Sequence, residues 1–218
     1  MWYAVYERTV YLMKYEWRKQ DKALYGAKKT PALVTIPVQN YIMLSGKGDP
    51  NDIDFSNRVG ALYSLAYGVK SAYKAAPLRE GIEDFAVYPL EGIWKKAEGD
   101  RLEKEKLEYT IMIRQPDFVT EDLVEEALET VRKKKPDPLY KEIQYRTMEN
   151  GLHVEILHVG PYDNEPVSFE KMDRFADAQG LRRLENSHRE IYLSSANRVE
   201  KSKLKTILRY AVERVLST

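Results

Sequence analysis

Residues 152–169, LHVEILHVGPYDNEPVSF, decide how the fold of this chain is interpreted. An extended apolar run is followed by a glycine, a polar loop and the start of a helix. Residues 41–55, YIMLSGKGDPNDIDF, repeat this order. Three residues recur 114 positions apart in the two stretches: Gly46 and Gly160, Asp49 and Asp163, and Phe55 and Phe169. Such an internal repeat predicts that one structural unit occurs twice in the chain.

Each stretch leads into a predicted helix and two predicted strands. These are a helix over 54–75 and strands over 84–96 and 106–115 in the first half, and a helix over 167–179 and strands over 188–195 and 204–212 in the second. Near the ends the match between the halves resumes at an offset of 95, where TIMIRQP (110–116) faces KTILRYA (205–211). We therefore expect the last segment to be a strand, although its composition would also suit a helix.

The sequence thus predicts an α+β fold of two pseudo-twofold-related strand-helix-strand-strand repeats, with antiparallel sheets and a ligand cleft between them. Residues 1–12 are expected to be dispensable. The expected parts are an N-terminal extension over 1–30, the first repeat with a connecting helix over 31–136, and the second repeat over 137–218, all in one domain.

Two connections carry local signals. Thr120 is the expected N-cap of the connecting helix, which Pro136 and Pro138 should end. Asn150-Gly151 lies between two strand-like runs, 141–148 and 152–159. Because Asn-Gly is the strongest short hairpin signal, we expect these two runs to pair with each other.

Composition excludes several classes of function. The 35 basic and 34 acidic residues give a net charge of +1, so we expect neither direct nucleic-acid binding nor binding to an anionic membrane. Cysteine is absent, which excludes disulfides and thiolate sites, and the three histidines lack a zinc-binding spacing. We expect no metal and no cofactor. No apolar run reaches the ~20 residues of a membrane span, and the first twelve residues do not resemble a signal peptide, so the cytoplasm is the expected location.

Aromatic residues are numerous, with sixteen tyrosines and three tryptophans among 218 residues. Tyrosine suits strand surfaces and interfaces, which would explain the excess without any special function. The alternative is an aromatic-lined cavity for a flat apolar ligand. The number of aromatic residues leaves both explanations open.

Several segments resemble the GyrI-like small-molecule-binding family. They are YEWRKQDKALY (15–25), GKGDPN (46–51), LYSLAYGVK (62–70), PLEGIW (89–94), YTIMIRQPDFVT (109–120), EILHVGPYDNEP (155–166), HREIYLS (188–194) and LKTILR (204–209). The similarity extends from Met13 to Arg209 and implies an apolar ligand cleft at the junction of two strand-helix-strand-strand units. In regulators of the family this domain follows a DNA-binding module. Only thirty residues precede Pro31, where the first extended run starts, so we expect a stand-alone protein.

The resemblance also implies two kinds of stand-alone relative. One is a gyrase-inhibitory protein. The other is a group similar to hydrolases of cyclopropanoid, DNA-alkylating natural products, in which a pocket glutamate and aromatic residues carry the chemistry. Glu190 matches the family's cleft glutamate by motif.

Strand alternation sorts the candidate site residues independently of the family. Ile191 and Leu193 form an apolar face expected to pack on the helix, so Glu190 and Tyr192 should point the other way, toward the cleft. Tyr88 and Trp94 share one face of their strand. Glu91 belongs to the opposite face by strict alternation, but Pro89 and Gly92 would permit a bulge that leaves its direction open. Tyr41 and Tyr109 complete the ligand-binding candidates.

These residues suggest one kind of chemistry. A carboxylate among aromatic rings loses hydration, which would suit Glu190 as a general base or as a charge partner for a cation. Trp94 and Tyr88 would hold a planar ligand, and the Tyr192 hydroxyl would stabilise a developing oxyanion. The alternatives are a solvated strand residue at Glu190 and ordinary packing of the two rings. His158 is expected to be structural, bonded to a loop carbonyl.

Three functions remain open on the sequence. The first is a protective hydrolase of cyclopropanoid or related planar, electrophilic xenobiotics. The second is a multidrug-binding protein that sequesters aromatic compounds without turnover, and the third is an interaction protein resembling the gyrase inhibitor. A cleft glutamate serves the first two equally, so residue patterns alone do not separate them. The oligomeric state is not predicted.

Overall fold

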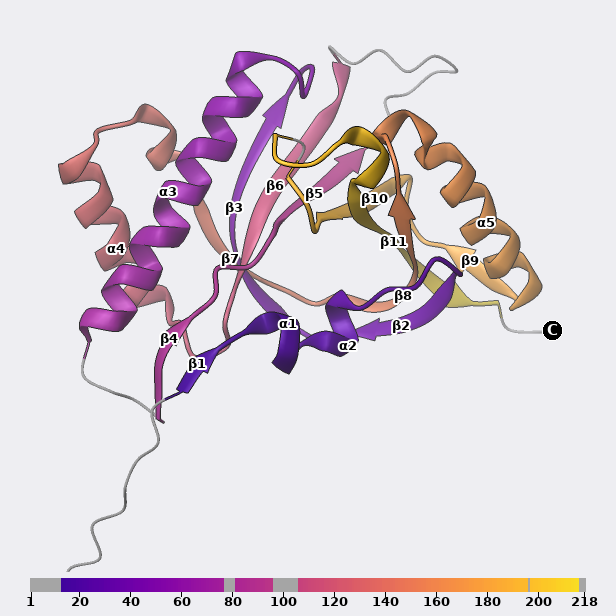
Figure 1. Cartoon of the computed structure of the whole chain (residues 1–218), viewed down its shortest axis with the longest axis horizontal. Coiled ribbons are helices and arrows are strands. Elements are labelled where there is room, and N and C mark those ends of the chain that lie inside the picture. The colour runs from indigo at the N-terminus through magenta and orange to yellow at the C-terminus, as the bar shows by residue number, and fades with distance from the viewer. Residues whose placement is uncertain (1–12, 77–80, 96–105, 196, 216–218) are drawn as a thin grey trace, which may run out of the picture.

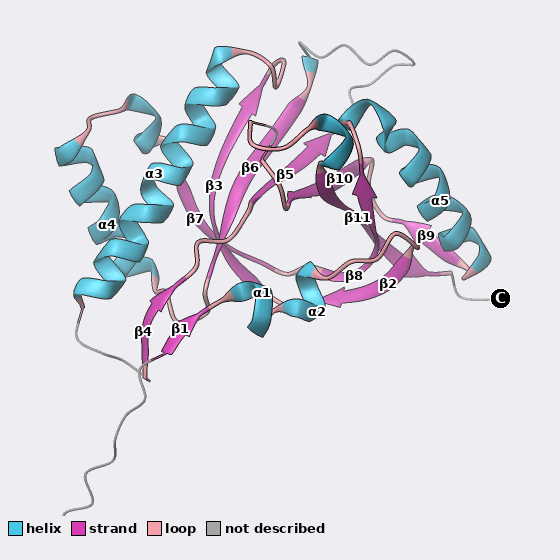
Figure 2. Ribbon diagram, in the orientation of Figure 1, coloured by secondary structure: helices cyan, strands magenta, loops and turns pink. Residues whose placement is uncertain are grey.

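A computed structural model of the chain describes residues 13–76, 81–95, 106–195 and 197–215 (Figure 1). A large antiparallel sheet carries helices on two flanks (Figure 2). Helices α3 (Ile53–Ala75) and α4 (Glu121–Lys134) pack against each other on one flank, and α5 (Glu165–Ala178) lies on the other. Within the described ranges, no helix is both long and apolar enough to cross a membrane.

The main sheet is assembled from both halves of the chain, and every pair of neighbours in it is antiparallel. Its strands are, in spatial order, β2 (Ala32–Ile36), β8 (Gly151–Val159), β11 (Lys205–Arg214), β10 (Ser187–Tyr192), β5 (Leu90–Lys95), β6 (Glu108–Gln115), β3 (Gln39–Lys47) and β7 (Gln144–Met148), with β9 (Leu181–Arg183) beside β11.

The remaining elements are short. A separate two-stranded sheet pairs β1 (Met13–Tyr15) with β4 (Ile82–Phe85), in parallel. The short helices are α1 (Trp17–Gln20), α2 (Lys22–Tyr25), η2 (Pro138–Lys141), η3 (Tyr162–Asn164) and η4 (Lys201–Lys203).

Both halves have the predicted order of strand, helix, strand, strand. The first half reads β3-α3-β5-β6, with the short β4 between α3 and β5, and the second reads β8-α5-β10-β11, with the short β9 between α5 and β10. The strand predicted over 84–96 is divided, because β4 ends at Phe85 in the separate two-stranded sheet and β5 begins at Leu90. The centre of the sheet lies between β10 and β5. Counted outward from there, the order is β10-β11-β8-β2 on one side and β5-β6-β3-β7 on the other, so equivalent strands occupy equivalent places. The expectation that the last segment is a strand is confirmed by β11. Thr120 also caps α4 as predicted, because its side chain accepts a hydrogen bond from the Leu123 amide.

The predicted hairpin at Asn150-Gly151 is wrong. Strand β7 pairs with β3, whereas β8 pairs with β2 and β11. The register is continuous, with Ile36 opposite Gly151 and Gln39 opposite Met148, so 32–43 and 144–155 form one long ribbon. The Asn150 side chain donates to the Pro37 carbonyl at 3.0 Å and ties the two connections together. Long-range pairing therefore overrides the local turn signal, and each half contributes a strand to the other.

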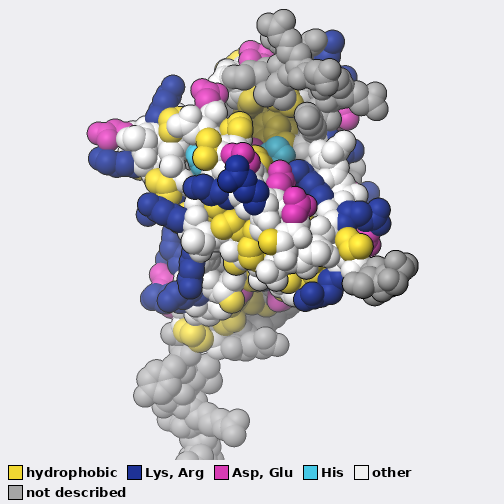
Figure 3. Space-filling model, turned by 90° about the vertical axis from the view of Figure 1, so that its right-hand side faces the viewer, with side chains coloured by type: hydrophobic (Ala, Val, Ile, Leu, Met, Phe, Trp, Pro, Cys, Tyr) yellow, Lys and Arg dark blue, Asp and Glu magenta, His cyan; other side chains and the backbone are white. Residues whose placement is uncertain are grey.

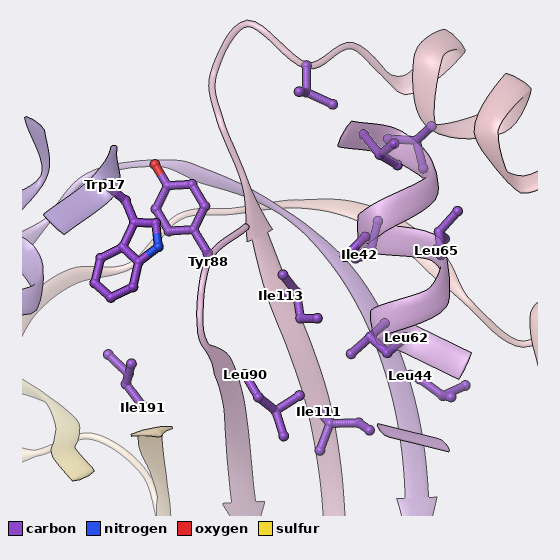
Figure 4. Close-up of a cluster of buried hydrophobic side chains, with 14 of the residues drawn as sticks. Trp17, Ile42, Leu44, Leu62, Leu65, Tyr88, Leu90, Ile111, Ile113 and Ile191 are labelled. Carbon is purple, nitrogen blue, oxygen red and sulfur yellow. The ribbon is translucent and has the colours of Figure 1, made fainter. Parts of the chain in front are cut away.

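The two faces of the sheet have different partners. One face packs on the helices: Ile111 and Ile113 of β6 lie near Leu62 and Leu65 of α3 (Figure 4). The opposite face is covered by the segment 17–25. Among the buried side chains of this segment, Trp17 donates a hydrogen bond to the Val87 carbonyl at 3.0 Å and stacks on Tyr88.

That segment therefore contributes to the core, whereas the expected dispensability of residues 1–12 concerns a part outside the described residues. The division of the chain at residues 30 and 136 stays a prediction.

Candidate functional site

Glu190 lies near the centre of the sheet, on β10, and is 9% exposed. Its carboxylate accepts a hydrogen bond from the Tyr192 hydroxyl at 2.8 Å and lies 2.9 Å from Nε2 of His188. The Tyr192 hydroxyl oxygen in turn accepts a hydrogen bond from Nε1 of Trp94 at 2.9 Å. Alternation along β10 and the pairing of His188 with Trp94 place all four side chains on one face. They form one hydrogen-bonded network.

The Tyr192 hydroxyl uses its hydrogen, and accepts a hydrogen bond, within this network. Burial raises its pKa well above the ordinary value for tyrosine, and the neighbouring charge of Glu190 adds to that shift. The hydroxyl therefore keeps its one hydrogen, which it donates to Glu190. It serves to hold the carboxylate, rather than being free to stabilise an oxyanion as the sequence suggested.

The expectation that Ile191 packs on the helix of its repeat while Glu190 points away from it is wrong. Glu190 faces the side of the sheet that carries α5, because it interacts with Glu165 in the first turn of that helix. Phe169 of α5 also meets the His188 ring edge-on, with 4.8 Å between centroids. Ile191 points to the opposite face, where Figure 4 shows it near Trp17. The apolar partner of Ile191 is thus the N-terminal segment and not a helix of the repeat, which alternation alone does not reveal.

Glu165 is the functional candidate that the sequence analysis missed. Its side chain is buried, and its Oε1 has no hydrogen-bond partner among the described residues. Burial, together with the adjacent Glu190 and the charge of Asp163, raises the pKa of Glu165 to about 9. At neutral pH Glu165 therefore keeps its proton. An acid in the first turn of a helix normally complements the helix dipole, so no sequence pattern indicated this pairing.

Aromatic rings extend from the network in two directions. The Trp94 ring lies 5.3 Å from Tyr109 and 5.9 Å from Phe55, and the rings of Phe55 and Tyr109 meet edge-on at 5.0 Å. On the other side, Tyr162 of η3 meets the Tyr192 ring edge-on at 6.0 Å and is 39% exposed. Phe55 and Tyr162 were not among the predicted ligand residues.

Three predicted ligand residues lie elsewhere. Glu91 points to the opposite face of the sheet, because its strand neighbour Gly92, and not Glu91 itself, pairs with Glu190. There it accepts a hydrogen bond from Tyr25 at 3.2 Å. Tyr41 and Tyr88 belong to the same buried face. The single cleft expected to contain Tyr88 together with Trp94 is therefore divided into two separate clusters.

This second cluster is ionic as well as aromatic. The Tyr88 hydroxyl donates to Asp21 at 2.5 Å, and Arg114 lies 3.3 Å from the same carboxylate. Arg189 donates to the Tyr41 hydroxyl at 3.2 Å. Arg189 also lies 3.6 Å from Oε2 of Glu91, an oxygen that no hydrogen-bond donor of the described residues reaches. The acidic and basic groups of this cluster are thus paired with one another inside the protein, which favours a structural role.

His158 fixes the loop that leads to Glu165. Its Nδ1 lies 2.9 Å from the Ser168 hydroxyl of α5, and its Nε2 lies 3.0 Å from the Pro161 carbonyl oxygen. The expectation of a structural histidine bonded to a loop carbonyl is confirmed. His158 thus contributes to the site indirectly, because it ties β8 to the first turns of α5.

The surface on the α5 side carries a hollow with apolar walls, beside which histidine and acidic side chains are visible (Figure 3). A separate surface groove of about 480 Å³ lies over β3, β6 and β7 and contains none of the predicted site residues. It is lined by Met43, Ser45, Thr110, Glu142, Gln144 and Arg146.

The antiparallel sheet flanked by helices, with a carboxylate held among aromatic rings, defines a small-molecule-binding α+β protein. The chain belongs to the GyrI-like family, because the model of the GyrI-like small molecule binding domain matches residues 29–211. None of the curated proteins matches the chain in sequence.

Solved structures agree with this assignment. An uncharacterised conserved protein from Listeria innocua is 37% identical, with a TM-score of 0.83 over 91% of this chain and all of its own. A hydrolase from Listeria innocua is 36% identical, with a TM-score of 0.84 over 92% of this chain and all of its own. The C-terminal domain of EcmrR has the same fold at 16% identity, with a TM-score of 0.52 over 85% of this chain and 98% of that domain.

Proposed function

We propose that this protein hydrolyses electrophilic, planar cyclopropanoid compounds, with Glu190 as the general base. The observation that carries the proposal is the position of the Glu190 carboxylate, which Tyr192 and His188 hold beside a group of aromatic rings. The 36% identity to a Listeria innocua hydrolase supports a hydrolytic reaction in general. The cyclopropanoid class comes from the resemblance of the sequence motifs.

The reaction adds one water molecule across a strained ring bond. The water oxygen bonds to a cyclopropane carbon, the ring carbon–carbon bond breaks, and its electron pair moves into the conjugated ring toward the carbonyl oxygen. Glu190 accepts the proton that the water loses. Since the product lacks the strained ring, it no longer alkylates DNA, and hydrolysis would protect the cell.

Ligand binding in this proposal uses the rings that surround the carboxylate. Trp94 and Tyr109 are buried and form the inner aromatic side of the site, whereas Tyr162 is exposed enough to meet an incoming ligand. The hollow on the α5 side is the proposed entrance. Because Glu190 is an acidic side chain held among aromatic rings, a planar cation would also suit the site, and reversible binding without turnover is the second candidate function.

One experiment separates these functions. The protein is incubated with a benzo-fused spirocyclopropyl dienone, and the products are identified by mass spectrometry. Formation of the ring-opened hydroxyethyl phenol faster than in buffer supports hydrolysis. Reversible binding of the intact compound, without product, would contradict hydrolysis and support sequestration instead.

A further inference from the structure

The proposed hydrolysis needs a proton donor as well as a base. As the ring opens, negative charge develops on the carbonyl oxygen of the substrate, and a group that donates a proton there would lower the barrier. Glu190 cannot supply that proton, since it must accept one from water. Tyr192 is also unsuitable, because its hydroxyl hydrogen is used to hold Glu190.

Glu165 has the position and the state that a donor requires. It lies in the first turn of α5, is 7% exposed and interacts directly with Glu190. The side chain of Glu165 contacts a second carboxyl group, that of Glu190, and no donor in the described part of the chain reaches its Oε1. Contact between two buried carboxyl groups is explained if Glu165 is protonated. Burying a second carboxyl group is costly, and a leucine at this position would avoid the cost. Glu190 already has two hydrogen-bond partners, so holding Glu190 alone would not require an acid here.

We infer that Glu165 is a second catalytic residue, the general acid that protonates the carbonyl oxygen of the substrate while Glu190 deprotonates the attacking water. This inference rests on the proposed hydrolysis. The protons balance: water loses one to Glu190, and the former carbonyl oxygen gains one from Glu165 and becomes a phenol. The carbon–oxygen bond forms as the ring carbon–carbon bond breaks, so the net change is the addition of water.

Contact between the two carboxyl groups also provides a way to reset the site. After the reaction Glu190 carries a proton and Glu165 is ionised, the reverse of the starting state. Transfer of one proton directly from Glu190 to Glu165 restores that state without any exchange with bulk solvent. The groups that face the pair are His188 and Tyr192 of β10, together with Tyr162 and Asp163 of η3.

The test compares Glu165→Gln with the parent protein on the spirocyclopropyl dienone. Glutamine keeps the size of the side chain but has no acidic proton. We expect kcat/KM to fall about 100- to 10,000-fold, the usual loss when a general acid is removed. Glu170→Gln changes an exposed acid on the same helix and serves as the matched control, with parental activity expected.

The dependence of rate on pH distinguishes catalysis from a structural role. In the parent, kcat/KM should decline as pH rises through about 9, where Glu165 loses its proton. This decline should be absent from the residual activity of Glu165→Gln and should return in Glu165→Asp, which restores an acid. Thermal melting of each variant establishes that it is folded.

The possible failures are distinct. If the parent protein does not hydrolyse the dienone, the proposed function falls, and the inference falls with it. If the parent hydrolyses the dienone and folded Glu165→Gln does so at the parental rate, the inference alone is wrong. A slowed Glu165→Gln that keeps the alkaline decline would also overturn the inference, because another group would then be the acid.

Discussion

Gly92 of β5 lies directly opposite Glu190 of β10, and a β-carbon at Gly92 would fall 2.7 Å from Nε1 of Trp94 and 3.3 Å from the Tyr192 hydroxyl. The absence of a side chain at Gly92 thus allows the indole to reach Tyr192. We expect Gly92→Ala to displace Trp94 and to lower the hydrolysis rate about 10- to 100-fold, since small misplacements of site groups have effects of this size. Steady-state kinetics would measure the loss. Gly60→Ala is the matched control, because a β-carbon there meets no atom within 4 Å and activity should be retained.

Glu190 and Trp94 should respond differently to substitution. Glu190→Gln keeps the shape of the side chain but removes the proton acceptor, so the hydrolysis rate should fall about 100- to 10,000-fold. Affinity for a neutral aromatic ligand should change little, because ring contacts carry it. Trp94→Ala should mainly weaken binding. Rates and Kd values for both variants test this prediction, and a parental rate in Glu190→Gln would rule out the general-base role.

Glu165 should make the stability of the protein depend on pH. Below about pH 4.5 the group is protonated in both the folded and the unfolded chain, and it imposes no penalty. Between about 4.5 and 9 the unfolded chain ionises it, while the folded protein keeps the proton. The folded state then binds more protons, so the free energy of unfolding falls as pH rises, by at most about 1.4 kcal/mol per pH unit.

Denaturant titrations across that window measure the effect. The free energy of unfolding of the parent should fall with pH relative to that of Glu165→Gln, which lacks the titrating group. Parallel pH dependences in the two proteins would show that Glu165 has no raised pKa. The comparison removes the contribution of His153, whose burial lowers its pKa to about 4 and which is present in both proteins.

Residues 1–12 and the segment that starts at Trp17 should differ sharply in their contribution to stability. Trp17 is 3% exposed and packs against Tyr25 and Tyr88, so Trp17→Ala should cost about 3–5 kcal/mol of unfolding free energy. Deletion of residues 1–12 should leave both stability and ligand affinity unchanged. Thermal melting of both variants tests the contrast, and a melting temperature several degrees lower after the deletion would show that residues 1–12 dock on the core.

The order of the elements was predictable because its signals are local. Glycine and apolar periodicity mark the strand-to-helix step in each half, and they gave the element order and the strand nature of β11. The facing of Glu190 was not predictable, since alternation separates two faces without saying what covers each one. Here the segment around Trp17 covers the face of Ile191 and leaves Glu190 on the α5 side.

Which residues make up the site was likewise only partly predictable from the sequence. Glu190 and Trp94 could be identified from the strands that carry them, and the structure places both in one network. Glu165 could not, because its raised pKa arises from burial against a residue 25 positions away. Tyr88 looked equivalent to Trp94 by spacing, but it precedes β5 and turns toward Asp21 instead.

The ribbon of 32–43 with 144–155 has a consequence for how the chain acquires its structure. It joins Ala32 to Glu155, 123 positions apart, and each half supplies the other with an edge strand. A ribosome must therefore release the chain as far as β8, which ends at Val159, before β2 finds its partner, so a newly made first half has an unpaired edge until then. The two repeats are alike in element order, yet each completes its part of the sheet only with a strand from the other. If the gene arose by duplication, the ancestral single unit would have completed its sheet by pairing with a second copy of itself.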